Sequence, residues 1–316
     1  MKFDFEKHKA EISEWKRKGN GSRTIADKLY EKYKVEVLSS SIRKAIARWG
    51  VTEDFIPNNQ AKVLLIDLET SHIIARVWGK WNQNINDNDI IKDWMILCWS
   101  GKWLFDEKVY NCSMTKKEIK NGNDKRVTKA LWQMFNEADV VIAHNLNKFD
   151  AKKANSKFIL HGLNSPKPYL SIDTLLHARK QFKMTSNRLD YLGEILGVGR
   201  KIDTPKGLWN MVEDGDMEAM KEMVKYCDQD VKLLEDVYLK MRGWIKPAPN
   251  LGLFSNDNEP VCPSCGSNDL KPNGEYHTTV STYQNYSCNN CGSHSRGRKT
   301  NLSKEQSSKI LSSSPK

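Results

Sequence analysis

The residues best suited to chemistry in this sequence are carboxylates and one tyrosine in three separate segments. Asp67 and Glu69 end the apolar segment VLLIDLET, and both point to one face because side chains alternate along a strand. Asp150 follows DVVIAHN at the start of a predicted helix, while Tyr226 and Asp230 share one flank of a longer predicted helix. Crowded carboxylates favour a divalent cation, and Mg²⁺ or Mn²⁺ prefers carboxylate oxygen. For Asp67 and Glu69 alone, a strand end with two solvated acids is the alternative.

The elements around these residues predict an α/β layer fold with a mixed sheet. Three strand-like segments, VLLIDLET, DWMILCW and KVYNC, come first, and helices then alternate with the strands DVVIAHN and YLSIDT. If the strands before Asp67 and Asp150 are neighbours, these two acids lie at the same end of the sheet. The asparagine-rich segment WNQNINDNDIIKD is expected to be a loop between the first two strands.

Two groups of charged residues are expected to lie on solvated helix faces. The lysines that follow Asp150 either face solvent, which we favour, or contact a substrate backbone. The acids that flank the buried stripe of the last long helix are expected to face water. The two groups are Lys152, Lys153 and Lys157, and Asp228, Glu235 and Asp236.

Three motifs in order resemble those of the DnaQ-like, or DEDD, 3′-5′ exonucleases. They are D-x-E-T at 67–70, H-N-x-x-x-F-D at 144–150 and Y-x-x-x-D at 226–230. The tyrosine is typical of the DEDDy branch, which includes proofreading domains of family A and family B DNA polymerases. The resemblance covers about residues 61–243 and implies a ribonuclease H-like mixed sheet flanked by helices. Residues 77–104 are also similar to a stretch of exonuclease-like proteins of bacteriophages.

The resemblance implies a metal-dependent 3′-5′ exonuclease with two Mg²⁺ or Mn²⁺ ions. Asp67 would bridge both ions, and Glu69 and Asp230 would hold the ion that activates water. Asp150 would support the second ion, largely through water. Tyr226 would orient the attacking water, since a phenol with a pKa near 10 is a poor general base at neutral pH.

Other residues of the motifs are expected to bind the substrate or to support the site. The resemblance implies contacts to the terminal nucleotides from Thr70, Asn145 and Phe149, although a core aromatic behind Asp150 is an equally good interpretation of Phe149. His144 is expected to be a hydrogen-bonded structural residue, because in the sister DEDDh branch the catalytic histidine takes the place of the tyrosine. Asp173, at the end of a predicted strand, is interpreted as a supporting or capping residue.

Four of the seven cysteines predict a structural zinc site. They form two C-x-x-C pairs separated by 22 residues, each followed by glycine, and four thiolates suit tetrahedral Zn²⁺ with no open position. The segment resembles zinc ribbons, which bind nucleic acid, bind protein or staple a small fold. The predicted ligands are Cys262, Cys265, Cys288 and Cys291.

The N-terminal segment predicts a helix-turn-helix with a basic second helix. In SSSIRKAIARWG the serines can cap the helix, and Arg43, Lys44 and Arg48 lie on the faces that the apolar residues leave free. These three residues are candidate DNA contacts, and a plain packing or protein-docking module is the alternative.

Five segments follow from these patterns and from the Pro/Gly-marked stretch KPAPNLGLF. They are a helix-turn-helix-like module at 1–56, the exonuclease domain at 61–243, a linker at 244–259, the zinc ribbon at 260–299 and a disordered tail at 300–316.

Composition agrees with a nucleic-acid partner. Fifty Lys and Arg against 39 Asp and Glu give a net charge of +11 over 316 residues, which attracts polyanions. No apolar run approaches the ~18 residues of a membrane span, and the charged start lacks a signal peptide's apolar region, so we expect a cytoplasmic protein without a membrane partner, in the host cytoplasm if phage-encoded.

The sequence therefore predicts an exonuclease that acts on single-stranded or frayed 3′ ends of DNA in replication, proofreading or repair. A DNA polymerase or replication complex is a candidate partner. Two alternatives remain: a 3′-5′ exoribonuclease, because the same carboxylates serve both polymers, and a non-catalytic DNA-binding or regulatory factor that uses the helix-turn-helix and the zinc ribbon.

Overall fold

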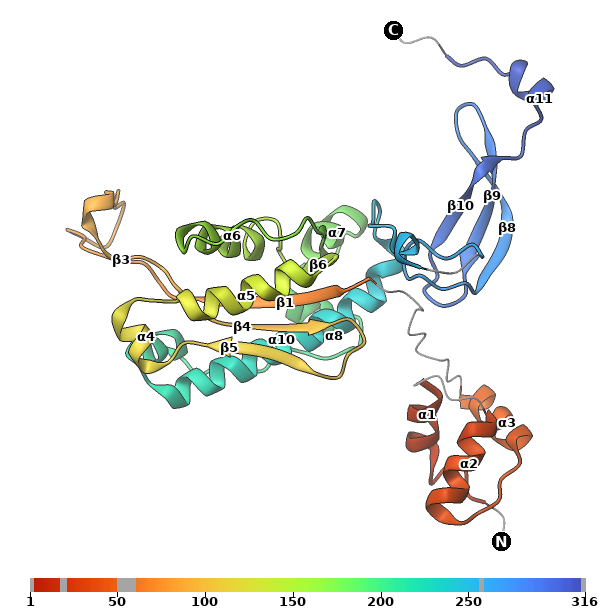
Figure 1. Ribbon diagram of the computed structural model, residues 1–316, viewed down its shortest axis with the longest axis horizontal. Coiled ribbons are helices and arrows are strands. Elements are labelled where there is room, and N and C mark those ends of the chain that lie inside the picture. The colour runs from red at the N-terminus through yellow and green to blue at the C-terminus, as the bar shows by residue number, and fades with distance from the viewer. Residues whose placement is uncertain (1–2, 18–21, 50–60, 256–258, 314–316) are drawn as a thin grey trace.

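The computed structural model describes residues 3–17, 22–49, 61–255 and 259–313 (Figure 1). Residues 50–56 of the predicted N-terminal module and residues 256–258 of the predicted linker lie outside this range. Among the described helices, none is both long and apolar enough to cross a membrane.

A five-stranded mixed sheet forms the centre of the fold, in the order β5-β4-β1-β6-β7. β1 is antiparallel to β4 and parallel to β6, so the strands that lead to Asp67 and Asp150 are neighbours that point the same way. The mixed α/β fold predicted from the sequence is confirmed, and it is consistent with a ribonuclease H-like fold. The strands are β1 (Val63–Thr70), β4 (Ile96–Trp103), β5 (Val109–Ser113), β6 (Val140–Ala143) and β7 (Leu170–Asp173).

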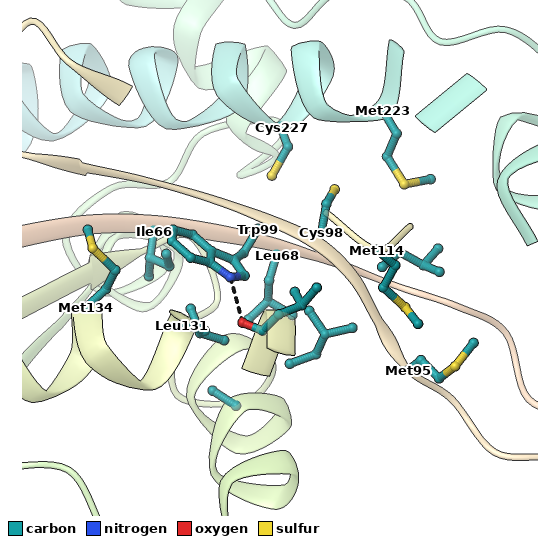
Figure 2. Close-up of a cluster of buried hydrophobic side chains, with 14 of the residues drawn as sticks. Ile66, Leu68, Met95, Cys98, Trp99, Met114, Leu131, Met134, Met223 and Cys227 are labelled. Carbon is teal, nitrogen blue, oxygen red and sulfur yellow. Dashed lines mark hydrogen bonds between the residues drawn. The ribbon is translucent and has the colours of Figure 1, made fainter. Parts of the chain in front are cut away.

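Helices cover both faces of this sheet (Figure 1). α5 and α6 lie on one side and the 25-residue α10 lies on the other. Figure 2 shows Cys227 and Met223 of α10 and Leu131 of α5 pointing toward the strands from opposite sides. The helices of this domain are α4 (Lys116–Asn121), α5 (Lys125–Glu137), α6 (Asp150–Leu160), α7 (Thr174–Gln181), α8 (Leu189–Ile195), α9 (Leu208–Glu213) and α10 (Met217–Met241).

The predicted loop at 81–93 includes one strand of a small hairpin, whose other strand precedes the loop. β2 (Ile74–Ala75) and β3 (Ile90–Lys92) pair antiparallel, and the 3₁₀ helix η1 (Asp87–Asp89) precedes β3. The hairpin extends away from the sheet beyond the end of β1 (Figure 1).

The N-terminal segment folds as three helices around a small apolar core. They are α1 (Lys9–Arg17), α2 (Ser22–Tyr33) and α3 (Ser39–Trp49). Lys44 and Arg48 are exposed on α3, and Arg48 lies 3.5 Å from Glu6. The side chain of Arg43 lies outside the described part of the structure, and the DNA-binding role of this unit stays a prediction.

The C-terminal segment is a three-stranded antiparallel sheet that carries the cysteine pairs. Its strands are β8 (Leu270–His277), β9 (Thr282–Cys288) and β10 (His294–Thr300). The preceding segment forms the 3₁₀ helices η2 (Arg242–Trp244) and η3 (Leu251–Phe254), and it buries Leu251 against the central domain. Within the tail predicted to be disordered, Ser303 and Gln306 form a capping box for a short helix, α11 (Lys304–Ser308).

Two of the acids expected to face water instead fix α10 against the sheet. Asp228 accepts hydrogen bonds from the Ser100 hydroxyl at 2.6 Å and from the Asn111 side-chain amide at 3.1 Å. Glu235 pairs with the buried Lys102, and its other oxygen accepts the Phe105 backbone N–H at 2.8 Å. The prediction was wrong for both acids because hydrogen-bond donors of β4 and β5 face this side of α10. The helical pattern of α10 alone does not reveal these partners.

The lysine run after Asp150 also departs from the expectation. Lys152 is exposed, but Lys157 is buried, with Nζ 2.6 Å from the Trp94 carbonyl oxygen and 3.3 Å from Asp124 Oδ2. The other oxygen of Asp124 lies 2.6 Å from His161 Nε2. A buried ion pair therefore ties α6 to the segment that precedes β4 and to the start of α5.

This ion pair predicts an unequal response to substitution within one region. Asp124→Asn leaves the Lys157 ammonium buried without a charge partner, and we expect it to lower the free energy of unfolding by about 3 kcal/mol. Lys152→Ala, on an exposed position of the same helix, should change it by less than about 0.5 kcal/mol. Urea denaturation followed by tryptophan fluorescence measures both values, and equal effects would contradict the assigned role of Asp124.

Candidate functional site

Three of the predicted carboxylates converge at the end of β1. Asp67 and Glu69 come from β1, and Asp230 comes from α10, where it is 1% exposed. One oxygen from each of the three lies within 4.8 Å of the others. Asp67 pairs in register with Ser100 of β4, and the register shifts directly after Glu69, where the strand carries an irregularity. The alternation along β1 and the antiparallel neighbour β4 therefore place both acids under α10.

The crowding and burial of these acids raise their pKa values. Burial and the negative charge of Asp230 raise the pKa of Asp67 to about 7. Burial, followed by the charges of Asp67 and Asp230, holds the pKa of Glu69 well above its usual range. The thiol of Cys227 donates a 3.3 Å hydrogen bond to Asp67 Oδ2, which opposes part of this shift. Like charges held together in a partly buried place favour either protons or a cation.

Lys201 is a residue of this site that the sequence motifs do not include. Its Nζ lies 2.5 Å from Asp230 Oδ2 and 3.0 Å from the Tyr226 hydroxyl oxygen. Its backbone N–H donates to Asp190 Oδ1 at 2.9 Å, which fixes the loop between α8 and α9. In the sequence Lys201 is simply the second of two adjacent basic residues after G-V-G, so no spacing rule indicates that its ammonium faces an acid 29 residues later.

Tyr226 lies beside the carboxylates, as predicted. Burial raises its pKa to about 12, so the hydroxyl stays protonated near neutral pH. Its ring meets the Trp209 ring edge to face, with centroids 6.3 Å apart. The hydroxyl can donate or accept a hydrogen bond, but it cannot act as an effective base.

Asp150 is close to the group without joining it. It is buried in the first turn of α6, and burial together with the charge of Asp67 raises its pKa well above the usual range. The set of oxygens within 4.8 Å of one another contains Asp67, Glu69 and Asp230 but not Asp150. This position agrees with a supporting carboxylate rather than a direct member of the three-acid set.

The second motif forms a turn that Asp173 fixes. Its carboxylate accepts the backbone N–H groups of Asn145 and Asn147, each at 3.1 Å, and it also caps α7. Asn145 has a φ of 87°, a left-handed conformation that asparagine tolerates better than most residues. The predicted capping role of Asp173 is confirmed, and the structure adds its hold on the turn that precedes Asp150.

His144 and Phe149 have structural contacts in this turn. The imidazole of His144 lies 2.9 Å from the Thr174 hydroxyl and 2.8 Å from the Asn187 carbonyl oxygen, which confirms the predicted structural role. Phe149 is partly buried against the main core, in agreement with the core-aromatic alternative. Thr70 is half-buried and pairs in register with Ile96. The side chains of Thr70 and Asn145 stay candidate substrate contacts.

The donor set of this site fits a hard divalent cation. Three carboxylates with oxygens close together match the ligand preference of Mg²⁺ and Mn²⁺. Asp230 Oδ1 is a buried oxygen without a hydrogen-bond partner among the described residues. Such an atom is costly to bury unless a cation or a donor meets it.

The four cysteines form a second candidate metal site. Their sulfurs all lie within 4.8 Å of one another, with 3.6 Å between Cys262 and Cys291 and 3.7 Å between Cys265 and Cys288. A tetrahedron with Zn–S bonds of about 2.3 Å has edges of about 3.8 Å, so these distances fit zinc. The buried Ser293 hydroxyl oxygen, 3.0 Å from Cys262 Sγ, is placed to donate to a thiolate.

Comparison with known proteins gives one family match, in the central domain. Residues 100–242 match the family model of the RNase_H superfamily, a match that runs from the second half of β4 to the end of α10 and does not include β1. A structural neighbour is the family B DNA polymerase from the hyperthermophilic archaeon Pyrobaculum calidifontis, with a TM-score of 0.42 and 16% identity. The alignment covers 57% of this chain and 24% of the polymerase, so this chain corresponds to about a quarter of that protein's length. No curated protein matches the sequence.

The electrostatics of Asp67 predict a pH-dependent response to metal. In the folded protein the pKa of Asp67 is raised from the usual 3.8 to about 7. Its contribution to the stability of the metal-free protein is therefore fully present below about pH 4 and is lost as the pH rises through about 7. A cation competes with this proton, so Mn²⁺ should raise the melting temperature more at about pH 8 than at about pH 6. Differential scanning fluorimetry with and without Mn²⁺ measures both shifts. Equal shifts at the two pH values, or a full shift in Asp67→Asn, would contradict the assignment.

Proposed function

We propose that this protein is a metal-dependent 3′-5′ exonuclease of the DEDDy type that hydrolyses phosphodiester bonds of DNA. The observation that carries the proposal is the convergence of Asp67, Glu69 and Asp230, with Tyr226 beside them. These residues come from two distant segments of the chain, which are the first and the third of the three motifs. The match of residues 100–242 to a nuclease superfamily supports the same chemistry.

Each residue then has a role that its position allows. Asp67 would bridge two Mg²⁺ or Mn²⁺ ions, Glu69 and Asp230 would complete the first site, and Asp150 would support the second. Bound cations supply a water of lowered pKa and neutralise charge on the phosphate and the leaving oxygen. Tyr226 orients the attacking water through its protonated hydroxyl.

Lys201 belongs to the same arrangement as a charge partner of the carboxylates. Its ammonium offsets part of the repulsion among them, and it holds the Asp230 carboxylate and the Tyr226 hydroxyl together. The 3′-5′ direction and the role in replication or repair rest on the resemblance of the three motifs to proofreading exonucleases. DNA is the proposed substrate, and RNA is an outcome that the experiment below decides.

Digestion of labelled strands tests the activity. Single-stranded DNA and RNA of equal sequence, labelled at the 5′ end, are incubated with Mg²⁺ or Mn²⁺, and the expected result is a ladder of DNA fragments that shorten from the 3′ end. Chelation and Asp67→Asn should each abolish it. A ladder only with RNA would support the exoribonuclease, internal cuts would contradict the exonuclease, and intact strands would support the DNA-binding factor.

Two acids on one helix provide a matched pair of variants. Asp230→Asn removes a carboxylate of the three-acid set, and we expect the rate to fall by more than about 100-fold, beyond the usual cost of losing a residue that only supports a metal ligand. Asp228→Asn keeps an acceptor for Ser100 and should leave the rate within about twofold. Gel-resolved initial rates at saturating substrate measure both, and similar losses in the two variants would contradict the assigned roles.

Tyr226→Phe separates orientation from base catalysis. The ring and its contact with Trp209 remain, while the hydroxyl is lost. Loss of one hydrogen bond of about 1–1.5 kcal/mol in the transition state lowers kcat by about 10-fold. Because the phenol is not the base, the pH profile of the remaining activity should keep its shape. A changed acidic or alkaline limb would show that Tyr226 titrates in the reaction.

For the C-terminal module we propose a structural zinc ion held by four thiolates. The purified protein should contain about one zinc per chain by mass spectrometry of its metals. Cys265→Ser should lose this zinc and lower the melting temperature, since metal binding contributes folding free energy. Cys112→Ser, a cysteine of the central sheet, is the control and should keep the zinc. Iron in place of zinc, or full zinc in Cys265→Ser, would overturn the assignment.

A further inference from the structure

We propose that the β2–β3 hairpin, residues 72–92, binds the unstacked bases of a single-stranded nucleic acid through Trp78 and Trp81. The hairpin would hold the strand next to the carboxylate group. This proposal rests on the proposed function in one respect only, which is that the 3′ end of the bound strand reaches Asp67 and Glu69.

The two indoles are exposed to an unusual degree. Trp78 is 103% exposed and Trp81 is 83% exposed, and Trp78 is the most exposed large apolar side chain in the described part of the chain. A tryptophan buries a large apolar area when it has a partner, so full exposure of two neighbours on one tip marks a surface that a ligand covers.

Hydrogen bonds within the hairpin hold the backbone of its tip. The side-chain amide of Gln83 donates to the Trp81 carbonyl oxygen at 2.6 Å, and Asn82 between them has a φ of 52°. Below the tip, the Arg76 backbone N–H donates to the Asp89 carbonyl oxygen at 2.8 Å and joins the two sides of the hairpin. These contacts hold the backbone that presents the indoles.

The base of the hairpin lies where β1 ends. His72 follows the strand closely, and Glu213 Oε1 accepts its backbone N–H at 2.7 Å and lies 2.9 Å from its Nδ1. The Ser71 backbone N–H donates to the Met95 carbonyl oxygen at 2.9 Å. Both ends of the hairpin are thus tied to the central domain beside Asp67 and Glu69, and the tip extends outward from there (Figure 1).

The charge of the tip favours nucleic acid as the occupant. Residues 76–81 read RVWGKW, with Arg76 and Lys80 next to the two indoles and no acidic residue, while Asp87 and Asp89 lie on the returning side. Aromatic faces that stack on bases, combined with cations that meet phosphates, are the general pattern of single-strand binding. An apolar protein partner would not require the two cations.

Binding without cleavage tests the hairpin. In an Asp67→Asn background and without divalent ions, fluorescence anisotropy measures the Kd for a labelled single-stranded DNA of about 15 nucleotides. Trp78→Ala/Trp81→Ala should raise the Kd by about 30-fold or more, because stacking contributes at least about 1 kcal/mol for each of two bases. Trp78→Phe/Trp81→Phe should keep most of the affinity. Trp244→Ala, an exposed tryptophan outside the hairpin, is the matched control and should change nothing.

An oligonucleotide with abasic positions identifies the contact as stacking. The parent protein should bind it more weakly than the intact strand, whereas the double alanine variant should bind both strands equally. Arg76→Ala/Lys80→Ala should instead reduce the dependence of the Kd on salt. Unchanged affinity in the double alanine variant overturns the proposal, and so does a change of sedimentation in place of affinity, which would make the hairpin a contact between copies of this chain.

The outcomes separate this proposal from the proposed function. A protein that binds strands through the two tryptophans but shortens none would contradict the exonuclease and leave the hairpin assignment intact. A protein that produces the 3′-shortened ladder with the same KM in the parent and in Trp78→Ala/Trp81→Ala would leave the exonuclease intact and overturn the hairpin assignment.

Discussion

The repulsion among Asp67, Glu69 and Asp230 is the constraint on which the rest of the structure depends. Three carboxylates with oxygens within 4.8 Å of one another cannot all be ionised in a partly buried place without a compensating charge. One central strand, β1, and the 25-residue α10 hold them there, and Lys201 supplies one positive charge. The arrangement of β1 and α10 therefore lowers the stability of the metal-free fold and favours the binding of a multivalent cation.

Polar contacts fix the helices that carry this group. Asp228 and Glu235 bind donors of β4 and its neighbouring segments, one on each side of Asp230 along α10. On the opposite face of the sheet, Lys157 fixes α6, which begins with Asp150. Apolar packing alone lets a helix shift along a sheet, whereas hydrogen bonds with defined partners set its position. Such precision matters most where several acids must face one another.

Local patterns predicted much of this fold and part of its site. Alternation and apolar runs indicated all five central strands, and the four-residue spacing placed Tyr226 and Asp230 on one flank of α10. Lys201 and Lys157 could not be found in this way, since their partners lie far along the chain and become neighbours only through the topology. The sequence also grouped Asp150 with the other acids, while in the structure it lies at the start of α6 and outside the set of oxygens within 4.8 Å of one another.

The residues that follow α10 pack closely against the cysteine module. A Cβ on Gly243 would lie 2.5 Å from the Cys291 carbonyl oxygen, and the Leu251 backbone N–H donates to the Pro263 carbonyl oxygen at 2.8 Å. The buried Tyr238 and Ser264, which lies between the first two cysteines, line the same tightly packed region. The boundary between the two modules is thus a packed interface and not a tether. A truncation that removes the cysteine module would expose the end of the helix that supplies Asp230.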